Sequence, residues 1–182
     1  MSETAPSSPA DRSAEPLLQV RDLGKSYGSK TVLDGVSFDL EVGETLVILG
    51  RSGTGKSVAL RHLNGLESPD RGTVIFDGTD LGPLDERRLY PVRRRMAMLF
   101  QSGALFDSMT VFDNIAFPLR EHTDWSHEHI AEVVAAKLDL VRLSGVEEQM
   151  PASLSGGMKK RVALARSLAL DPELVLYDEP TT

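Results

Sequence analysis

The sequence Gly50-Arg51-Ser52-Gly53-Thr54-Gly55-Lys56-Ser57 lies between an apolar run, residues 45–49, and the apolar residues 58–60. This order predicts a buried strand, a glycine-rich turn and the start of a helix. Glycines let successive backbone N–H groups curl around phosphate oxygens, and a helix N-terminus adds partial positive charge. We therefore expect residues 50–57 to bind a nucleotide, with Lys56 at its β- and γ-phosphates and Ser57 offering its hydroxyl to Mg²⁺. A chance glycine-rich turn is the alternative, which the strand and helix expected on either side disfavour.

The composition is that of an ordinary globular domain. With 182 residues, 41% hydrophobic and 26% charged, the chain is long enough for one domain with a sizeable core. Its net charge of -7 argues against a nucleic-acid partner, because an acidic surface repels phosphates at long range. The absence of cysteine excludes disulfides, thiolate catalysis and cysteine metal sites. No apolar run approaches the roughly 20 residues that span a bilayer, so we expect a cytosolic chain or one held to a membrane by a partner.

The N-terminal third of the chain predicts a tail followed by antiparallel strands. Residues 1–16 are rich in Ser, Ala, Pro and Glu, and we expect a disordered tail there. Residues 17–23 and 36–40 alternate between apolar and polar, as half-buried antiparallel strands do. Tyr27 lies in the turn expected between them. It is either a packed loop aromatic or a ring that stacks on a purine, and its spacing alone does not decide between the two.

The middle of the chain predicts an alternation of helices and strands. We expect the helix that starts at Lys56 to end before Gly65, and residues 71–78 and 96–100 to form short strands, the second leading to Gln101. Residues 85–95 carry five arginines. Nucleic-acid binding is one interpretation of these arginines, but the acidic total charge favours a solvated helical face.

A helical insert is expected over about residues 102–153. Thr110 is placed to cap a short helix through Leu119, and Ser126 to cap a longer helix from His127 to about Leu143. His127 and His129 are two residues apart and point to different sides of that helix, so they are poor metal ligands. The apolar face expected for the longer helix comprises Ile130, Val133, Val134, Leu138 and Val141.

The last part of the chain carries two more motifs. Leu154-Ser155-Gly156-Gly157 opens a predicted helix through Arg166, and the apolar strand expected over residues 174–177 ends in Asp178-Glu179. An acidic pair at the end of a strand beside a phosphate-binding loop suits Mg²⁺ binding and activation of a water. We expect Asp178 to hold the metal and Glu179 to accept the proton of the attacking water. An exposed strand end is the alternative for this pair taken alone.

These residues together, from about residue 17 to the end, resemble the ATP-binding cassette (ABC) ATPases. The resemblance implies an α/β fold, a P-loop NTPase core with an antiparallel β edge and an α-helical insert. It also implies that Tyr27 stacks on adenine and that Gln101 senses Mg²⁺ and the attacking water. Ser155, Gly156 and Gly157 would cap the γ-phosphate of an ATP held by a second subunit, in a homodimer.

Within that family the chain resembles the Mla/Mce branch, the ATPases of phospholipid transporters of the bacterial inner membrane. Residues 101–115 lack the proline of the commoner importers, and residues 157–161 read Gly-Met-Lys-Lys-Arg in place of the usual glutamines. The resemblance implies a membrane permease and a periplasmic Mce-type lipid-binding protein as partners, and a location on the cytoplasmic face of the inner membrane. An importer ATPase for a small solute and a non-transport ABC protein remain the alternatives.

Two expectations concern the insert and the end of the chain. The insert is more apolar than a surface segment needs to be; some of its apolar side chains must pack internally, and the surplus predicts a groove for a permease helix. The apolar residues are Ala104, Leu105, Phe106, Met109, Val111, Phe112, Ile115 and Phe117, of which Phe106 and Phe112 are expected to contact the permease unless they belong to the core. The D-loop and switch histidine of the ABC family would follow Asp178, whereas all four histidines precede it. We therefore expect a C-terminally truncated chain that is by itself a weak or inactive ATPase.

Overall fold

The structure is a computed structural model that describes residues 15–99 and 104–178. The chain divides into two compact units, Met1–Leu89 (unit 1) and Tyr90–Thr182 (unit 2). Of the predicted site residues, Gln101 and Glu179 lie outside the described part of the chain, as does nearly all of the expected tail.

Unit 1 contains an antiparallel sheet in the order β2-β1-β3-β4. The central strand β1 (Leu18–Tyr27) pairs with β2 (Lys30–Leu40) on one side and with β3 (Arg71–Phe76) on the other. In this register Val20 lies opposite both Phe38 and Val74. The alternating pattern therefore predicts the pairing of β1 with β2 correctly, but it makes both strands too short, at residues 17–23 and 36–40, and it places Tyr27 in the turn rather than in β1. It also misses the short strand β4 (Thr79–Asp80).

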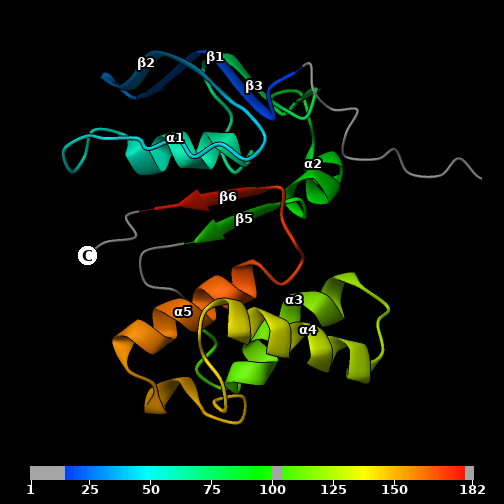
Figure 1. The fold of residues 1–182 in the computed structure, drawn as a ribbon. Helices are drawn as coiled ribbons and strands as arrows, with labels where there is room; N and C mark the ends of the chain where they lie inside the picture. Colours follow the sequence, from blue (N-terminus) through cyan, green and yellow to red (C-terminus); the bar gives the residue numbers. More distant parts are fainter. Residues whose placement is uncertain (1–14, 100–103, 179–182) are drawn as a thin grey trace, which may run out of the picture. The chain divides into compact units, whose positions relative to one another are not determined.

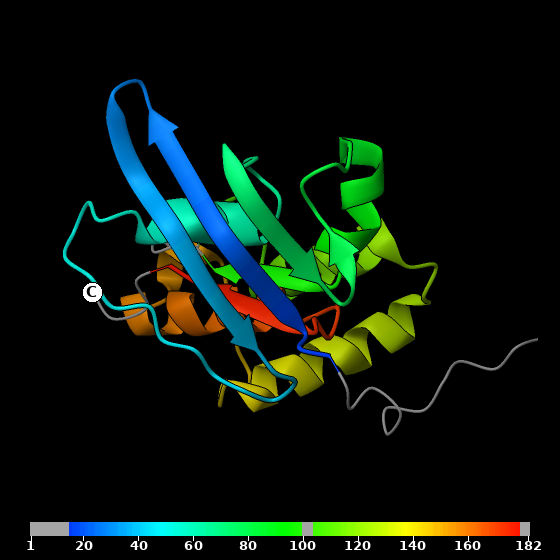
Figure 2. The ribbon, with the colours of Figure 1, turned by 90° about the horizontal axis from the view of Figure 1, so that it is seen from above.

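Helix α1 (Lys56–Leu63) covers one face of this sheet, as Figure 1 and the view from above in Figure 2 both show. The buried residues of the helix are Ala59, Leu60, His62 and Leu63. It ends as predicted, because Gly65 adopts a left-handed φ of 68° and its N–H donates to the carbonyl of His62.

Unit 2 pairs two short parallel strands, β5 (Met96–Leu99) and β6 (Leu174–Tyr177). A bidentate salt bridge joins the residues that precede the two strands. Arg95 donates from Nε and Nη2 to the two carboxylate oxygens of Glu173 at 2.7 and 2.8 Å. Residues 100–173 lie between these strands in the sequence.

Helices α3 (Val111–His122), α4 (His127–Leu140) and α5 (Gly156–Ser167) pack around one apolar core in unit 2 (Figure 1). A hydroxyl caps each of the three N-termini, from Thr110, Ser126 and Ser155. The caps at Thr110 and Ser126 and the helix start at Ser155 agree with the sequence. Unit 2 also contains a 3₁₀ turn, Pro151–Ser153, and the division between the units falls within α2 (Glu86–Arg93).

One expected strand and two expected helix ends are also wrong. Residues 45–49 form no strand: none of the described strands pairs with them, and Leu49 is 87% exposed. A strand needs a neighbour for its backbone N–H and C=O groups, and an apolar run alone does not provide one. Helix α4 stops at Leu140 rather than near Leu143, because Arg142 adopts a left-handed φ of 55°. Helix α3 runs past Leu119 to His122 despite Pro118.

Candidate functional site

The phosphate-binding turn predicted at residues 50–57 leads into α1 through Gly55. This residue has φ 100° and ψ 8° and occupies the N-cap position. A Cβ atom added to Gly55 would lie 2.8 Å from Cγ1 and 3.1 Å from the carbonyl oxygen of Val32 in β2, so only glycine fits. No side chain caps this helix, and its first turn, all of it described, contains no acidic residue. The N-terminus of α1 is therefore suited to an anion.

Lys56 lies over the turn that precedes it. Its Nζ donates to the carbonyl oxygens of Gly50 at 2.9 Å and Arg51 at 3.1 Å. The hydroxyl of Thr54 donates to the same Arg51 carbonyl at 2.9 Å. The turn is thus folded on itself with an ammonium group above it, and the structure brings residues 50–57 together as the sequence predicts.

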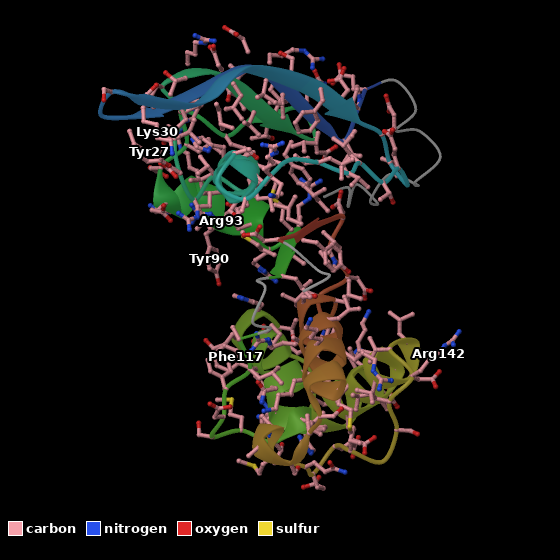
Figure 3. All side chains as sticks on the ribbon, turned by 90° about the vertical axis from the view of Figure 1, so that its left-hand side faces the viewer. Tyr27, Lys30, Tyr90, Arg93, Phe117 and Arg142 are labelled. Atoms are coloured by element: carbon pink, nitrogen blue, oxygen red, sulfur yellow. The ribbon has the colours of Figure 1, made fainter. Side chains whose placement is uncertain are left out.

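Tyr27 is the last residue of β1 and is 43% exposed. Its partner in the register is Lys30, which lies beside it in Figure 3. Two residues further along β2, Val32 packs against Gly55. The β1–β2 hairpin therefore carries Tyr27 toward the phosphate-binding turn within unit 1.

The hydroxyl of Tyr27 donates to Oε1 of Glu67. This hydrogen bond is the largest cause that raises the pKa of Tyr27 above its ordinary value, and it lowers the pKa of Glu67. Glu67 was not predicted from the sequence, because a single glutamate in a loop carries no pattern. The contact arises only when β1 and the loop after α1 come together.

The other predicted site residues lie in unit 2. The Ser155 hydroxyl accepts from the N–H of Met158 at 3.2 Å, and no atom lies within 4 Å of a Cβ added to Gly156 or Gly157. The backbone at the start of α5 is therefore open to a ligand. Asp178 directly follows β6, and its N–H donates to the carbonyl of Leu99, the last residue of β5, at 3.1 Å. The structure thus places Asp178 where the paired parallel strands end.

Unit 2 also contains a groove of about 560 Å³ with a largely apolar lining. Phe106 and Phe117 contact each other in its wall, with ring centroids 5.0 Å apart, and are 41% and 37% exposed. Tyr90, Arg93 and Phe117, three of the residues that line it, are labelled in Figure 3. Other lining residues are Met96, Met98, His122 and Leu170.

Two polar side chains hold the segment beside this groove, the buried Asn114 and the half-buried Arg166. Asn114, in α3, accepts from the N–H of Phe106, and its amide nitrogen lies 2.9–3.2 Å from three carbonyl oxygens of residues 106–110, which share its two hydrogens. Arg166 of α5 donates to the carbonyl of Ala104 at 2.9 Å and lies over the Phe106 ring. Neither residue was predicted from the sequence, although an asparagine on the apolar face that contains Val111 and Ile115 is a usable signal.

Comparison with known proteins gives one family. The family model described as "ABC transporter" matches residues 33–182. The "Probable ribonucleotide transport ATP-binding protein mkl" of Mycobacterium leprae is 49% identical over 163 residues, which cover 90% of the chain and 47% of that protein. The "Intermembrane phospholipid transport system ATP-binding protein MlaF" of Escherichia coli is 45% identical over 170 residues, which cover 93% of the chain and 63% of that protein.

Two solved structures share the fold. The dimeric, post-hydrolysis structure of the ATP-binding cassette MJ0796 bound to ADP and Pi matches with a TM-score of 0.82 at 31% identity, over 90% of this chain and 74% of that one. The structure of cbiO1 from Clostridium perfringens, part of the ABC transporter complex cbiONQ, matches with a TM-score of 0.84 at 27% identity, over 92% and 66%. The chain spans about half the length of the mkl relative and under two thirds of the MlaF relative.

Proposed function

Because the chain belongs to the ABC transporter family, we propose that it is the part of a transporter that binds ATP and hydrolyses it. The observation that carries this proposal is the turn before α1, where Gly55 fits only without a side chain and Lys56 lies above the loop. These are the groups that surround and neutralise the phosphates of a nucleotide.

The remaining site residues have complementary roles in this proposal. The hydroxyl of Ser57 in unit 1 and the carboxylate of Asp178 in unit 2 are each a hard oxygen donor, the kind that Mg²⁺ prefers, so the chemistry of these side chains suits that ion. When bound, Mg²⁺ would neutralise charge on the phosphates. Glu179 follows Asp178 and would accept the proton of the attacking water, with Gln101 positioning that water. Tyr27 would stack on the adenine.

A second copy of the chain would complete each ATP site. Ser155, Gly156 and Gly157 present an uncovered backbone at the start of α5, which suits the γ-phosphate of an ATP held by that copy. The MJ0796 cassette, which resembles this chain in fold, is dimeric with ADP and Pi bound. These two observations support a two-fold arrangement in which each start of α5 would face the other copy's P-loop.

The groove in unit 2 would receive a cytosolic helix of a membrane permease. No helix in the described ranges 15–99 and 104–178 is long and apolar enough to cross a membrane. The groove offers aromatic and methionine side chains, including Phe106, Phe117 and Met96, which are favoured at protein interfaces. The permease would hold the chain at the cytoplasmic face of the bacterial inner membrane.

We favour phospholipid as the transported substrate, with a periplasmic Mce-type lipid-binding protein as a further partner. The support is the 45% identity to a protein named for intermembrane phospholipid transport, together with the motifs at residues 101–115 and 157–161. Ribonucleotide transport is the second candidate, because the mkl relative is 49% identical and is named for that substrate.

The nucleotide part of the proposal is tested by titrating the chain with Mg-ATP in a calorimeter. Lys56→Ala should weaken binding at least about tenfold, because it removes charge-assisted hydrogen bonds to phosphate. Lys137→Ala is the matched control: it removes a lysine whose ion pair with Asp171 lies in unit 2. Equal affinities of Lys56→Ala and the unaltered chain would refute the proposed phosphate site.

The substrate is decided by capturing the permease from detergent-solubilised membranes and rebuilding the complex in vesicles. ATP-dependent transfer of a fluorescent phospholipid would support the favoured substrate. Uptake of a labelled ribonucleotide without lipid transfer would support the second candidate instead.

A further inference from the structure

Two neighbouring side chains contact Tyr27: one binds its hydroxyl group and the other lies over one face of its ring. Its hydroxyl donates to Glu67, and the Nζ atom of Lys25 lies 5.7 Å from the ring centroid. A cation at that distance is attracted to the face of an aromatic ring. Because the ring is nevertheless 43% exposed, a second surface of it remains open to a ligand.

Lys25 is itself fixed by its surroundings. Its side chain is only 14% exposed, and its ammonium donates to the Ser68 carbonyl at 2.9 Å and to Oδ1 of Asp70 at 3.2 Å. The other oxygen of Asp70 accepts from the N–H of Ser26 at 2.7 Å. The cation therefore does not swing away from the ring, and it blocks the face that it covers.

Glu67 belongs to the loop that follows the phosphate-binding helix. The N–H groups of Leu66 and Glu67 both donate to the carbonyl of Arg61 in the last turn of α1, at 2.9 and 3.3 Å. The side chain of Asn64 accepts from Leu66 at 3.1 Å. Glu67 is thus fastened to one end of α1, and the phosphate-binding turn lies at the other end, about 12 Å away along the helix axis.

From this geometry we infer that Glu67 is a positioning residue for the purine base of the nucleotide. It fixes the rotation of the Tyr27 ring relative to α1, while Lys25 covers one face and leaves the opposite face to stack on the base. The base-binding ring and the phosphate-binding turn are then set by the same helix. This inference rests on the proposed ATP site and adds residues 25 and 67 to it.

The test compares two ligands of the full chain, Mg-ATP and magnesium tripolyphosphate, which lacks the base. Glu67→Ala and Tyr27→Phe both remove the hydrogen bond between these two residues, so each should weaken Mg-ATP binding by about threefold to tenfold. Glu67→Ala also removes the ion pair of Glu67 with Lys25, whose atoms are 3.6 Å apart. The double variant should therefore bind Mg-ATP no more weakly than Glu67→Ala alone, because Tyr27→Phe removes nothing that Glu67→Ala has left. Glu67→Gln keeps an acceptor oxygen and should restore part of the affinity. Tripolyphosphate affinity should stay unchanged in all of them.

Asp39→Ala is the matched control, since it removes the carboxylate that pairs with Arg21, another side chain of β1. It should bind both ligands like the unaltered chain. The inference is overturned if Glu67→Ala leaves Mg-ATP affinity unchanged, or if tripolyphosphate affinity falls as much as Mg-ATP affinity, which would show a structural role through α1. If the unaltered chain binds neither ligand, the proposed ATP site fails and this inference fails with it.

Discussion

Gly55 and Gly28 both adopt a left-handed backbone conformation, but only Gly55 is also closely packed. Gly55 combines a backbone conformation that side chains rarely adopt with a neighbour, Val32, that leaves no room for a methyl group. Gly28 in the β1–β2 hairpin shares the first property, at φ 59°, but nothing lies within 4 Å of its added Cβ. A side chain at Gly28 would cause backbone strain alone, whereas a side chain at Gly55 would cause both backbone strain and a steric clash with Val32.

Gly55→Ala should lower the free energy of unfolding by about 2–4 kcal/mol, because strain of about 1–3 kcal/mol adds to the cost of moving Val32. Gly28→Ala should cost only the strain. Urea unfolding of both variants, without nucleotide, measures the difference. Equal losses would show that the contact with Val32 contributes nothing.

The N-terminus of helix α3 is held by hydrogen bonds of Asp113. The backbone N–H of Asp113 donates to the hydroxyl of Thr110 at 3.0 Å, and the same hydroxyl donates to Oδ2 of Asp113 at 3.0 Å. Arg120 donates to the other carboxylate oxygen, Oδ1, at 2.8 Å. The hydrogen bond from Arg120 is the largest cause that lowers the pKa of Asp113 below its ordinary value of 3.8, and the bond from Thr110 adds to it.

A lowered pKa in the folded state means that the carboxylate form is favoured by folding. The resulting stabilisation is present above the ordinary value and is lost as the pH falls through the lowered one. The unaltered chain should therefore be more stable than Asp113→Asn at pH 7, and the difference should shrink below about pH 4. Urea unfolding at both pH values checks this. Asp124→Asn, between α3 and α4, changes the same charge outside the cap, and a difference as large as that for Asp113→Asn would contradict the explanation.

The elements differ in how well the sequence predicts them. The hydroxyl caps at Thr110 and Ser126 and the helix start at Ser155 were predictable because capping is local chemistry. The end of α4 was not predictable from the sequence. A glycine after a helix indicates a left-handed conformation that ends it, whereas Arg142, which adopts that conformation here, gives no such indication. The apolar run at residues 45–49 gave a wrong strand, since its composition does not show which strand pairs with it.

Among the candidate site residues, too, those in local motifs were predictable and those defined by contacts between separate segments were not. Residues 50–57, Ser155 and Asp178 were predictable from motifs in which neighbouring residues act together. Glu67 and Asn114 were not, because Glu67 meets a segment far away in the sequence and Asn114 bonds the backbone of an irregular segment before its helix. The roles given to all of these site residues remain predictions, and Gln101 and Glu179 in addition lie outside the described part of the chain.

Docking of the chain to a permease should depend on the groove in unit 2. Phe106 and Phe117 line it and are partly exposed, whereas Phe112 packs against the buried core of α3, α4 and α5. The expectation that Phe112 contacts the permease therefore lacks support, since it is not among the residues that line the groove.

Phe117→Asp should weaken co-purification with the permease at least about tenfold while ATP affinity stays nearly unchanged, because a charge would be buried in an apolar interface. Phe112→Asp should instead lower the free energy of unfolding. Pull-down from solubilised membranes and thermal unfolding measure the two effects. Undiminished capture by Phe117→Asp would remove the groove as the docking site.

The pairing of β5 with β6 across residues 100–173 has a consequence for the order of folding. The two strands can pair only after the intervening chain has been closed into a loop, which lowers the entropy of the chain before any strand contact forms. Helices α3, α4 and α5 contact one another over shorter separations in the sequence. The three helices should therefore assemble first and draw the strand ends together. Pulsed hydrogen exchange during refolding should show protected amides in α3 and α5 before those of Ala97 and Leu176. During refolding, Asp178 would therefore form its hydrogen bond with Leu99 only after the three helices have assembled.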